Sequence, residues 1–219
     1  MKDFLEIVEK VETRREFLKT SSEIVLVVDY GAGKPEDKRT KVEMEKGVLQ
    51  EVSLKNLASI GVKREKAKVI FDIFSEIQPR KILELGTCCG FSSSYMSFFA
   101  KNADIITLEG SPNVVKIARE NHEFFRIKNV QVVEGRFDLT LPGILCENKF
   151  DFAFIDGHHN KDATIGYFKE ILPSMNKGAV MLFDDILWSE GMQEAWSFIV
   201  DSKMHKKCEE KERMGLLWL

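Results

Sequence analysis

The alternation of short apolar strands with helix-length segments between residues 81 and 183 constrains the fold more than any other feature. Strands are predicted at residues 81–85, 104–108, 130–134, 150–155 and 179–183, and each gap between them can hold a helix. A series of strand–helix–strand units forms a parallel sheet that helices cover on both faces. We therefore predict an α/β protein with a doubly wound, mostly parallel sheet.

The segments on either side of this series complete the predicted organisation. Residues 3–18 have apolar side chains at helical spacing, residues 24–28 form a β-branched strand, and residues 30–47 are rich in charge, Gly and Pro. That charged segment indicates a loop or flap, and a solvated linker would have the same composition. We predict an N-terminal extension over residues 1–62. The catalytic domain then runs over residues 63–219, where a helix at 63–77 precedes the sheet and the C-terminal stretches add an antiparallel strand pair as its sixth and seventh strands.

Charge and cysteine usage limit the class of protein. The formal net charge is -3, so no broad cationic surface is available to bind a nucleic-acid backbone, and we expect no nucleic-acid partner. The four cysteines include an adjacent pair, a spacing that suits neither a disulfide framework nor a zinc site. The first residues lack the apolar run of a signal peptide, and no stretch has membrane-spanning length. We predict a cytoplasmic protein without a membrane partner.

The segment ILELGTCCGFS at residues 82–92 predicts a buried strand that enters a tight turn and then a helix. Ligands of doubly wound sheets bind beyond the carboxyl ends of the strands, where glycine lets the backbone approach them. Gly86 and Gly90 lack the G-x-G-x-x-G spacing of a dinucleotide site, and Glu84 would repel a pyrophosphate. The pattern therefore disfavours NAD and favours S-adenosylmethionine, which carries sulfonium and ammonium groups. Glu109 ends the next strand, where a carboxylate can accept hydrogen bonds from both ribose hydroxyls of a cofactor. Alternatively, the glycines serve only the turn.

Three further carboxylates are predicted to meet at the same sheet edge. Asp156 follows one strand, and Asp184 and Asp185 follow the next. Hard oxygen ligands suit Mg²⁺, Ca²⁺ or Mn²⁺, and such a cation can lower the pKa of an attacking hydroxyl and fix its position. Strand-end acids can instead cap a helix or bind the ammonium of a cofactor. His158 and His159 follow Asp156, and an imidazole can accept a hydroxyl proton at neutral pH, although either could simply cap the loop.

The motifs ELGTCCGFSSSYM and IITLEGSP resemble those of the catechol and caffeoyl-CoA O-methyltransferase group of class I S-adenosylmethionine-dependent methyltransferases, over residues 63–219. The resemblance implies a Rossmann-like fold and a bound S-adenosylmethionine. At the matching positions it places Glu84, Gly86, Gly90 and Ser92 at the methionine end of the cofactor and Glu109 at the ribose; the turn VVEGRF aligns with the adenine-contacting turn and adds Gly135, Arg136 and Phe137.

The same resemblance assigns the acids and the histidine. It implies that Asp156, Asp184 and Asp185 bind a divalent cation, with Mg²⁺ as the first candidate. Asp185 stands where the metal-dependent enzymes carry asparagine. His159 stands three residues after Asp156, where the catechol enzyme carries its catalytic lysine, so His159 is the predicted base. Trp188, in DDILW, matches a substrate-site tryptophan and predicts either an aromatic wall for the acceptor or an anchor for the next helix.

We therefore predict an O-methyltransferase that acts on a hydroxyl of a small acceptor, assisted by a divalent cation and by His159. The alternatives are a metal-independent N- or O-methyltransferase of small molecules and a non-catalytic S-adenosylmethionine-binding protein of the same fold. Related enzymes are commonly dimers, so the resemblance also implies a homodimer.

Overall fold

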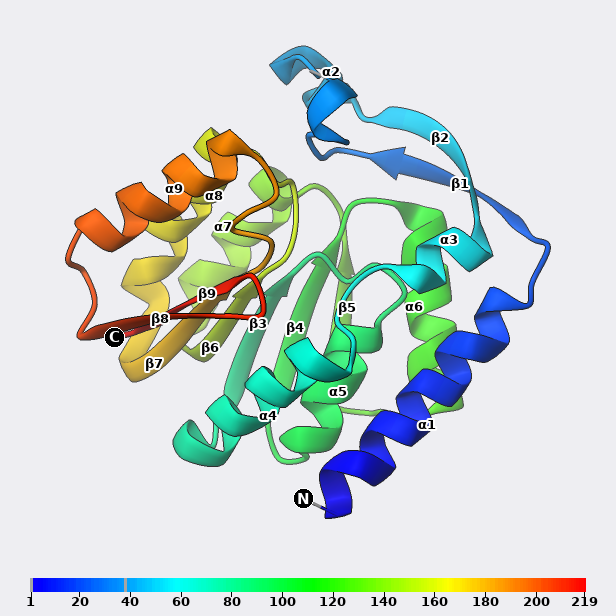
Figure 1. The fold of residues 1–219 in the computed structure, drawn as a ribbon, viewed down its shortest axis with the longest axis horizontal. Helices are drawn as coiled ribbons and strands as arrows, with labels where there is room; N and C mark the ends of the chain where they lie inside the picture. Colours follow the sequence, from blue (N-terminus) through cyan, green and yellow to red (C-terminus); the bar gives the residue numbers. More distant parts are fainter. Residues whose placement is uncertain (1, 38) are drawn as a thin grey trace.

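In the computed structural model, which describes residues 2–37 and 39–219, a seven-stranded sheet lies between two layers of helices (Figure 1). In the order of the sheet the strands are β5 (Val130–Glu134), β4 (Asp104–Glu109), β3 (Lys81–Leu85), β6 (Phe150–Ile155), β7 (Met175–Phe183), β9 (Met214–Trp218) and β8 (Lys207–Lys211). Strands β3 to β7 are parallel, and β9 is antiparallel to both of its neighbours. The predicted doubly wound sheet with an antiparallel C-terminal pair is confirmed.

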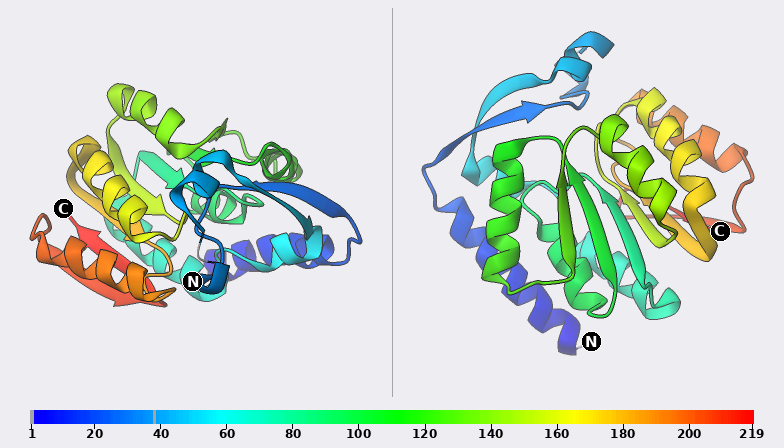
Figure 2. Two further views of the ribbon diagram at one scale, coloured as in Figure 1. Left: turned by 90° about the horizontal axis from the view of Figure 1, so that it is seen from above. Right: turned by 180° about the vertical axis from the view of Figure 1, so that it is seen from behind.

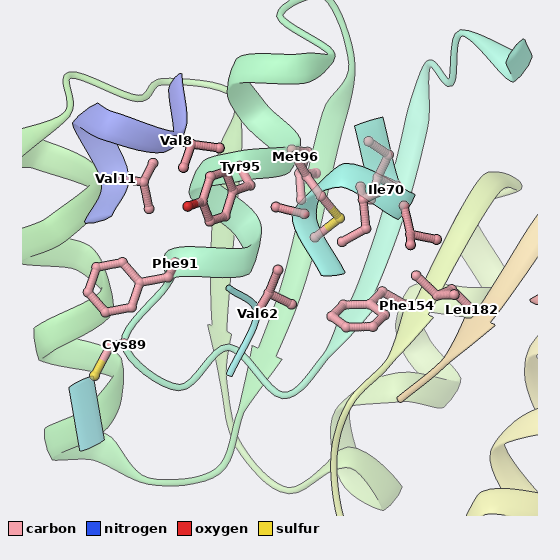
Figure 3. Close-up of a cluster of buried hydrophobic side chains, with 14 of the residues drawn as sticks. Val8, Val11, Val62, Ile70, Cys89, Phe91, Tyr95, Met96, Phe154 and Leu182 are labelled. Atoms are coloured by element: carbon pink, nitrogen blue, oxygen red, sulfur yellow. The ribbon is translucent and has the colours of Figure 1, made fainter. Parts of the chain in front are cut away.

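The central strands send alternate side chains into two apolar layers, as expected for a sheet that is buried on both faces. Ile82 joins one layer and Leu83 the other, and both are fully buried. Figure 3 shows part of the first layer, where Phe154 and Leu182 of the sheet face Ile70 and Met96 of the helices. The helices of this layer are α1 (Lys2–Lys19), α3 (Leu54–Ser59), α4 (Arg64–Ile77), α5 (Phe91–Phe99) and α6 (Pro112–Phe124); those of the other are α7 (Phe137–Glu147), α8 (Lys161–Ile171) and α9 (Glu190–Asp201).

The strand order reverses between β3 and β6. From β3 the chain moves outward through β4 to β5, and it then crosses back to place β6 on the opposite side of β3. The loops that follow β3 and β6 consequently diverge to opposite faces of the sheet, which opens a crevice at its carboxyl edge. The glycine turn after β3 and the Asp-His segment after β6 flank this crevice.

The N-terminal extension combines a core helix with a separate hairpin. Val8 and Val11 of α1 are buried beside Tyr95 of α5 (Figure 3), so α1 shares the main core. Strands β1 (Ile24–Asp29) and β2 (Val48–Ser53) pair antiparallel to form a two-stranded sheet of their own. Seen from above, this hairpin passes over part of the large sheet (Figure 2). The division into residues 1–62 and 63–219 stays a prediction.

The predicted loop over residues 30–47 is partly wrong, because it contains the 3₁₀ turn η1 (Pro35–Asp37) and the short helix α2 (Lys41–Lys46). Thr40 and Glu43 form a capping box at the start of α2, each side chain accepting from the backbone N–H of the other. The sequence T-x-x-E signals this cap, but four of the six residues of the following helix are charged, so the segment lacks the apolar pattern of a helix. We name residues 30–47 together with β1 and β2 the lid hairpin.

Within the described residues, every helix is too short or too polar to span a bilayer.

Candidate functional site at the carboxyl edge of the sheet

Backbone hydrogen bonds tie together the loops that leave the carboxyl ends of the parallel strands. The N–H of Gly86 donates to the carbonyl of Leu108, and the N–H of Asp156 donates to the carbonyl of Leu85, at 3.0 and 2.9 Å. The N–H groups of Gly135 and Asp184 make equivalent 2.9 Å bonds to neighbouring strands. Side chains that sequence analysis assigned to one site therefore share one sheet edge.

The glycine turn is held closed by contacts that leave no room for side chains. A Cβ on Gly86, whose φ is +99°, would lie 2.1 Å from the carbonyl oxygen of Asp156. A Cβ on Gly90, whose φ is +76°, would lie 2.8 Å from Nε2 of His122 behind the turn. Both glycines are therefore required by the turn itself. For Gly90 this packing role is the one that the structure displays, and a contact with a cofactor stays a prediction.

Glu84 is fully buried beneath the turn. The Thr107 hydroxyl donates to Oε2 of Glu84 at 2.5 Å, whereas Oε1 has no partner among the described residues. Burial raises the pKa of Glu84 to about 8, and the nearby Ser92 and Thr107 hydroxyls oppose this rise. A cationic or donor group that reached Oε1 would stabilise the ionised form. Ser92, also predicted for the site, is buried in the first turn of α5.

Glu109 stands at the end of β4 as predicted. Its carboxylate accepts the N–H of Cys88 at 3.0 Å and the N–H of Ser111 at 2.9 Å, one on each oxygen. Burial raises the pKa of Glu109, and these backbone donors oppose the rise. Because each carboxylate oxygen has two acceptor sites, both oxygens keep capacity for a hydroxyl donor.

The turn after β5 lies between the lid hairpin and the histidine loop. The Arg136 guanidinium pairs with Asp138 at 2.6 Å and donates to the carbonyl of Glu45 in α2. The ring of Phe137 packs directly against Gly157: a Cβ on that glycine would lie 2.7 Å from Cε2 of the ring. Gly135, Arg136 and Phe137 are thus brought to the site edge.

His159 lies beside Asp156, with 3.5 Å between Nε2 and Oδ1, which is an ion-pair distance but too long for a good hydrogen bond. Burial acts to lower the pKa of His159, but Asp156, followed by Asp185 and Asp184, raises it above its ordinary value. The other imidazole has a different environment, since Nδ1 of His158 lies 2.8 Å from the Tyr167 hydroxyl and burial lowers the pKa of His158. The loop thus presents one imidazole to the acids and anchors the other.

A lysine that sequence analysis did not identify occupies the acidic cluster. Nζ of Lys66 lies 2.5 Å from Oδ1 of Asp184 and 3.2 Å from Oδ1 of Asp185, and Arg213 approaches Asp185 at 3.6 Å. Burial and then Asp156 raise the pKa of Asp184, while Lys66 opposes the rise. Because the ammonium is in direct contact with it, the ionised pair is the form that this geometry stabilises. The described residues contain no group of three His, Cys, Asp or Glu side chains placed to hold a metal ion.

Lys66 could have been found from topology. The helix that precedes a parallel strand begins at the carboxyl edge of the sheet, and Lys66 lies in the first turn of α4, directly before β3. In the sequence it stands among other lysines and so carries no signal of its own.

Trp188 completes the acid side of the site. Its ring centroid lies 6.1 Å from that of His159, and the residue is 37% exposed. A helix anchor would be buried, so this exposure favours the aromatic wall over the anchor.

Comparison with known proteins agrees with this arrangement. Residues 83–186, from within β3 to just beyond the acids after β7, match the family model described as a methyltransferase domain. Catechol O-methyltransferase B of Danio rerio is 31% identical over 157 residues, which cover 68% of this chain and 58% of the relative. Catechol O-methyltransferase of Mycobacterium tuberculosis is 30% identical over 138 residues, covering 62% and 61%. The chain thus spans about three fifths of the length of these curated relatives.

Solved structures share the fold. The O-methyltransferase from Bacillus cereus in complex with SAH superposes with a TM-score of 0.64 at 23% identity, covering 75% of this chain and 85% of that one. The O-methyltransferase TomG from Streptomyces achromogenes in complex with SAM gives a TM-score of 0.60 at 21% identity, covering 72% and 81%. The chain therefore has the Rossmann-like methyltransferase fold and resembles class I S-adenosylmethionine-dependent O-methyltransferases of the catechol and caffeoyl-CoA group, as predicted.

Proposed function

We propose that this protein is an S-adenosylmethionine-dependent O-methyltransferase that methylates a hydroxyl of a small acceptor. The observation that carries the proposal is the placement of the His159–Asp156 pair directly beside the glycine turn, since Asp156 is the residue that Gly86 contacts. A proton acceptor and a cofactor turn thus meet at the switch point of the sheet. The methyltransferase match over residues 83–186 supports the same reaction class.

The residues at the turn fit the proposed cofactor. Glu84 offers a buried oxygen that no described residue contacts by a hydrogen bond, Glu109 has unused acceptor capacity, and Asp156 adds a third carboxylate. Such a set attracts a molecule that carries sulfonium and ammonium groups and two ribose hydroxyls, and it repels a pyrophosphate. When bound, the cofactor would supply an electrophilic methyl group on its sulfonium, and cleavage of the sulfur–methyl bond would leave the neutral thioether S-adenosylhomocysteine.

The reaction requires an acceptor hydroxyl that loses its proton as its oxygen attacks that methyl group. His159 is the proposed base: its imidazole takes the hydroxyl proton, and Asp156 beside it stabilises the imidazolium that forms. Trp188, next to His159 and partly exposed, provides a flat apolar surface on which a planar acceptor can be oriented. The acceptor hydroxyl would therefore lie on the acid side of the crevice, beside His159 and Trp188.

The predicted divalent cation fits the donors in kind but not in arrangement. Asp184 and Asp185 are oxygen donors, yet both carboxylates contact Lys66, and Asp156 lies against His159. Lys66 already offsets the charge that a cation would neutralise, so we assign the cation no step. Mg²⁺ dependence stays a prediction from sequence, and methyl transfer in excess chelator tests it. Cytoplasmic location and a homodimer likewise stay predictions.

The test of the proposed function is methyl transfer from labelled S-adenosylmethionine to a panel of small phenols, sugars and amines that includes catechol, the acceptor named for the curated relatives. We expect label on hydroxylated acceptors and a loss of 10²- to 10⁴-fold in kcat for His159→Ala, with unchanged cofactor affinity. His205→Ala, which removes an imidazole outside the site, is the matched control. Label on amines alone would favour N-methylation, and cofactor binding without transfer to any acceptor would favour a non-catalytic protein.

A further inference from the structure

The ring of Tyr30, in the lid hairpin, fits between two glycines that are far apart in sequence. A Cβ on Gly110 would lie 2.6 Å from Cδ2 of the ring, and a Cβ on Gly47 would lie 2.8 Å from Cε1. Each distance is shorter than real Cβ contacts, so any other residue at Gly47 or Gly110 would displace the ring. Gly47 belongs to the lid hairpin itself, whereas Gly110 directly follows strand β4 of the large sheet. The contact with Gly110 therefore fixes the lid to the catalytic fold at one defined point.

That point lies next to the proposed ribose acid. Gly110 directly follows Glu109, the proposed ribose acid, and the guanidinium of Arg136 in the proposed adenine turn lies 5.9 Å from the centre of the Tyr30 ring. The ring thus stands between the two loops that would hold the adenosyl group. The two edges of the ring meet the glycines, and the Arg136 guanidinium lies over one of its faces.

Several hydrogen bonds hold the rest of the lid hairpin on the same edge. The N–H of Val28 donates to the Ser111 hydroxyl at 3.1 Å, and the N–H of Ala32 donates to the carbonyl of His158 at 2.8 Å. The carbonyl of Glu45 accepts from Arg136. These bonds cross from the lid to the loops after β4, β5 and β6, so the lid spans the adenosyl end of the site.

We propose that Tyr30 packs against the adenosyl group of the cofactor and that the lid hairpin covers that end of the site. This inference rests on the proposed function, because it needs S-adenosylmethionine as the ligand. It assigns the N-terminal extension a direct part in binding the cofactor, in addition to the packing of α1 in the core.

Calorimetric titration with S-adenosylhomocysteine tests the proposed function and the Tyr30 inference separately. Stacking of a base on an aromatic ring gives at least about a tenfold gain in affinity, so Tyr30→Ala should raise Kd by that factor or more. Tyr30→Phe keeps the ring and should bind within about twofold of the unmodified protein. Leu49→Ala changes an exposed side chain of the same hairpin, 65% exposed, and should have no effect. If the unmodified protein does not bind, the proposed function fails; if it binds and Tyr30→Ala binds equally well, only the lid inference fails.

Limited trypsin digestion gives an independent readout of the lid. Lys41 and Lys46 are exposed in the lid hairpin and neither precedes proline, so tryptic cleavage after them reports how firmly the hairpin is held. S-adenosylhomocysteine should slow this cleavage in the unmodified protein and in Tyr30→Phe, and should protect Tyr30→Ala much less at saturating ligand. Equal protection of all three proteins would overturn the proposed contact.

Discussion

The imidazole of His122 supports the glycine turn from behind, and its burial predicts how the stability of the protein depends on pH. His122 is 5% exposed, its Nε2 lies 2.9 Å from the Ser93 hydroxyl, and the same nitrogen faces Gly90. Burial lowers the pKa of His122 to about 4, because a charged imidazolium would lose its hydration there. The folded protein therefore keeps this side chain neutral over most of the acidic range.

The sign and size of the effect follow from linkage between protonation and folding. In the unfolded chain a histidine titrates near 6.5, so below that pH the unfolded state takes up a proton that the folded state refuses. The contribution of His122 to stability is complete above 6.5 and decreases as the pH falls toward about 4. Between pH 7.5 and pH 5 this decrease amounts to roughly 2 kcal/mol of unfolding free energy, at about 1.4 kcal/mol per pH unit below 6.5.

Urea unfolding at pH 7.5 and pH 5 measures this difference directly. In His122→Gln the loss of stability between the two pH values should be about 2 kcal/mol smaller than in the unmodified protein, since all other titrating groups are shared. His205→Gln, in the loop before β8, is the control and should keep the full difference. An unchanged pH difference in His122→Gln would refute the reasoning, whatever the substitution does to stability at a single pH.

Three further predictions concern the site itself. Gly86→Ala should cost at least about 2 kcal/mol of stability and weaken S-adenosylhomocysteine binding, because its Cβ meets the Asp156 carbonyl at positive φ, whereas Gly166→Ala, with nothing within 4 Å, should be harmless in both assays. Lys66→Met should reduce the free energy of unfolding by about 3 kcal/mol, because it leaves Asp184 without its cationic partner. Mg²⁺ should then raise the melting temperature of this variant more than that of the unmodified protein. An equal Mg²⁺ response in the two proteins would count against Lys66 as the charge-balancing group. The rate of methyl transfer should increase with pH through a midpoint above about 6.5, because the proposed base His159 must be neutral and Asp156 raises its pKa. The pH–rate profile of Asp156→Asn, measured at saturating cofactor, should have a lower midpoint.

The order of elements and the positions of the strand-end acids could be predicted from sequence. Strands that are buried on both faces are continuous apolar runs, and in a parallel sheet their last residues must meet at one edge, so Glu84, Glu109, Asp156 and Asp184 were assigned to a common site without a structure. The glycine turn could also be predicted, because glycine adopts positive φ more readily than other residues and so marks tight turns in a sequence. Gly86 and Gly90 do have positive φ in the structure. These features depend on local conformation and on a topology that the periodic pattern specifies.

Which side chains neutralise, cover or support those acids was decided only by tertiary structure. Lys66 reaches Asp184 across 118 residues, and Tyr30 reaches Gly110 from a hairpin whose second strand was not predicted. A lysine or a tyrosine in a charged segment has the same appearance in sequence whether it faces solvent or a distant loop. Its partner depends on the path of the whole chain, since contacts between remote segments are set by packing and not by periodicity. The sequence by itself thus determined where the acids and the glycine turn lie, and the tertiary structure determined what surrounds them.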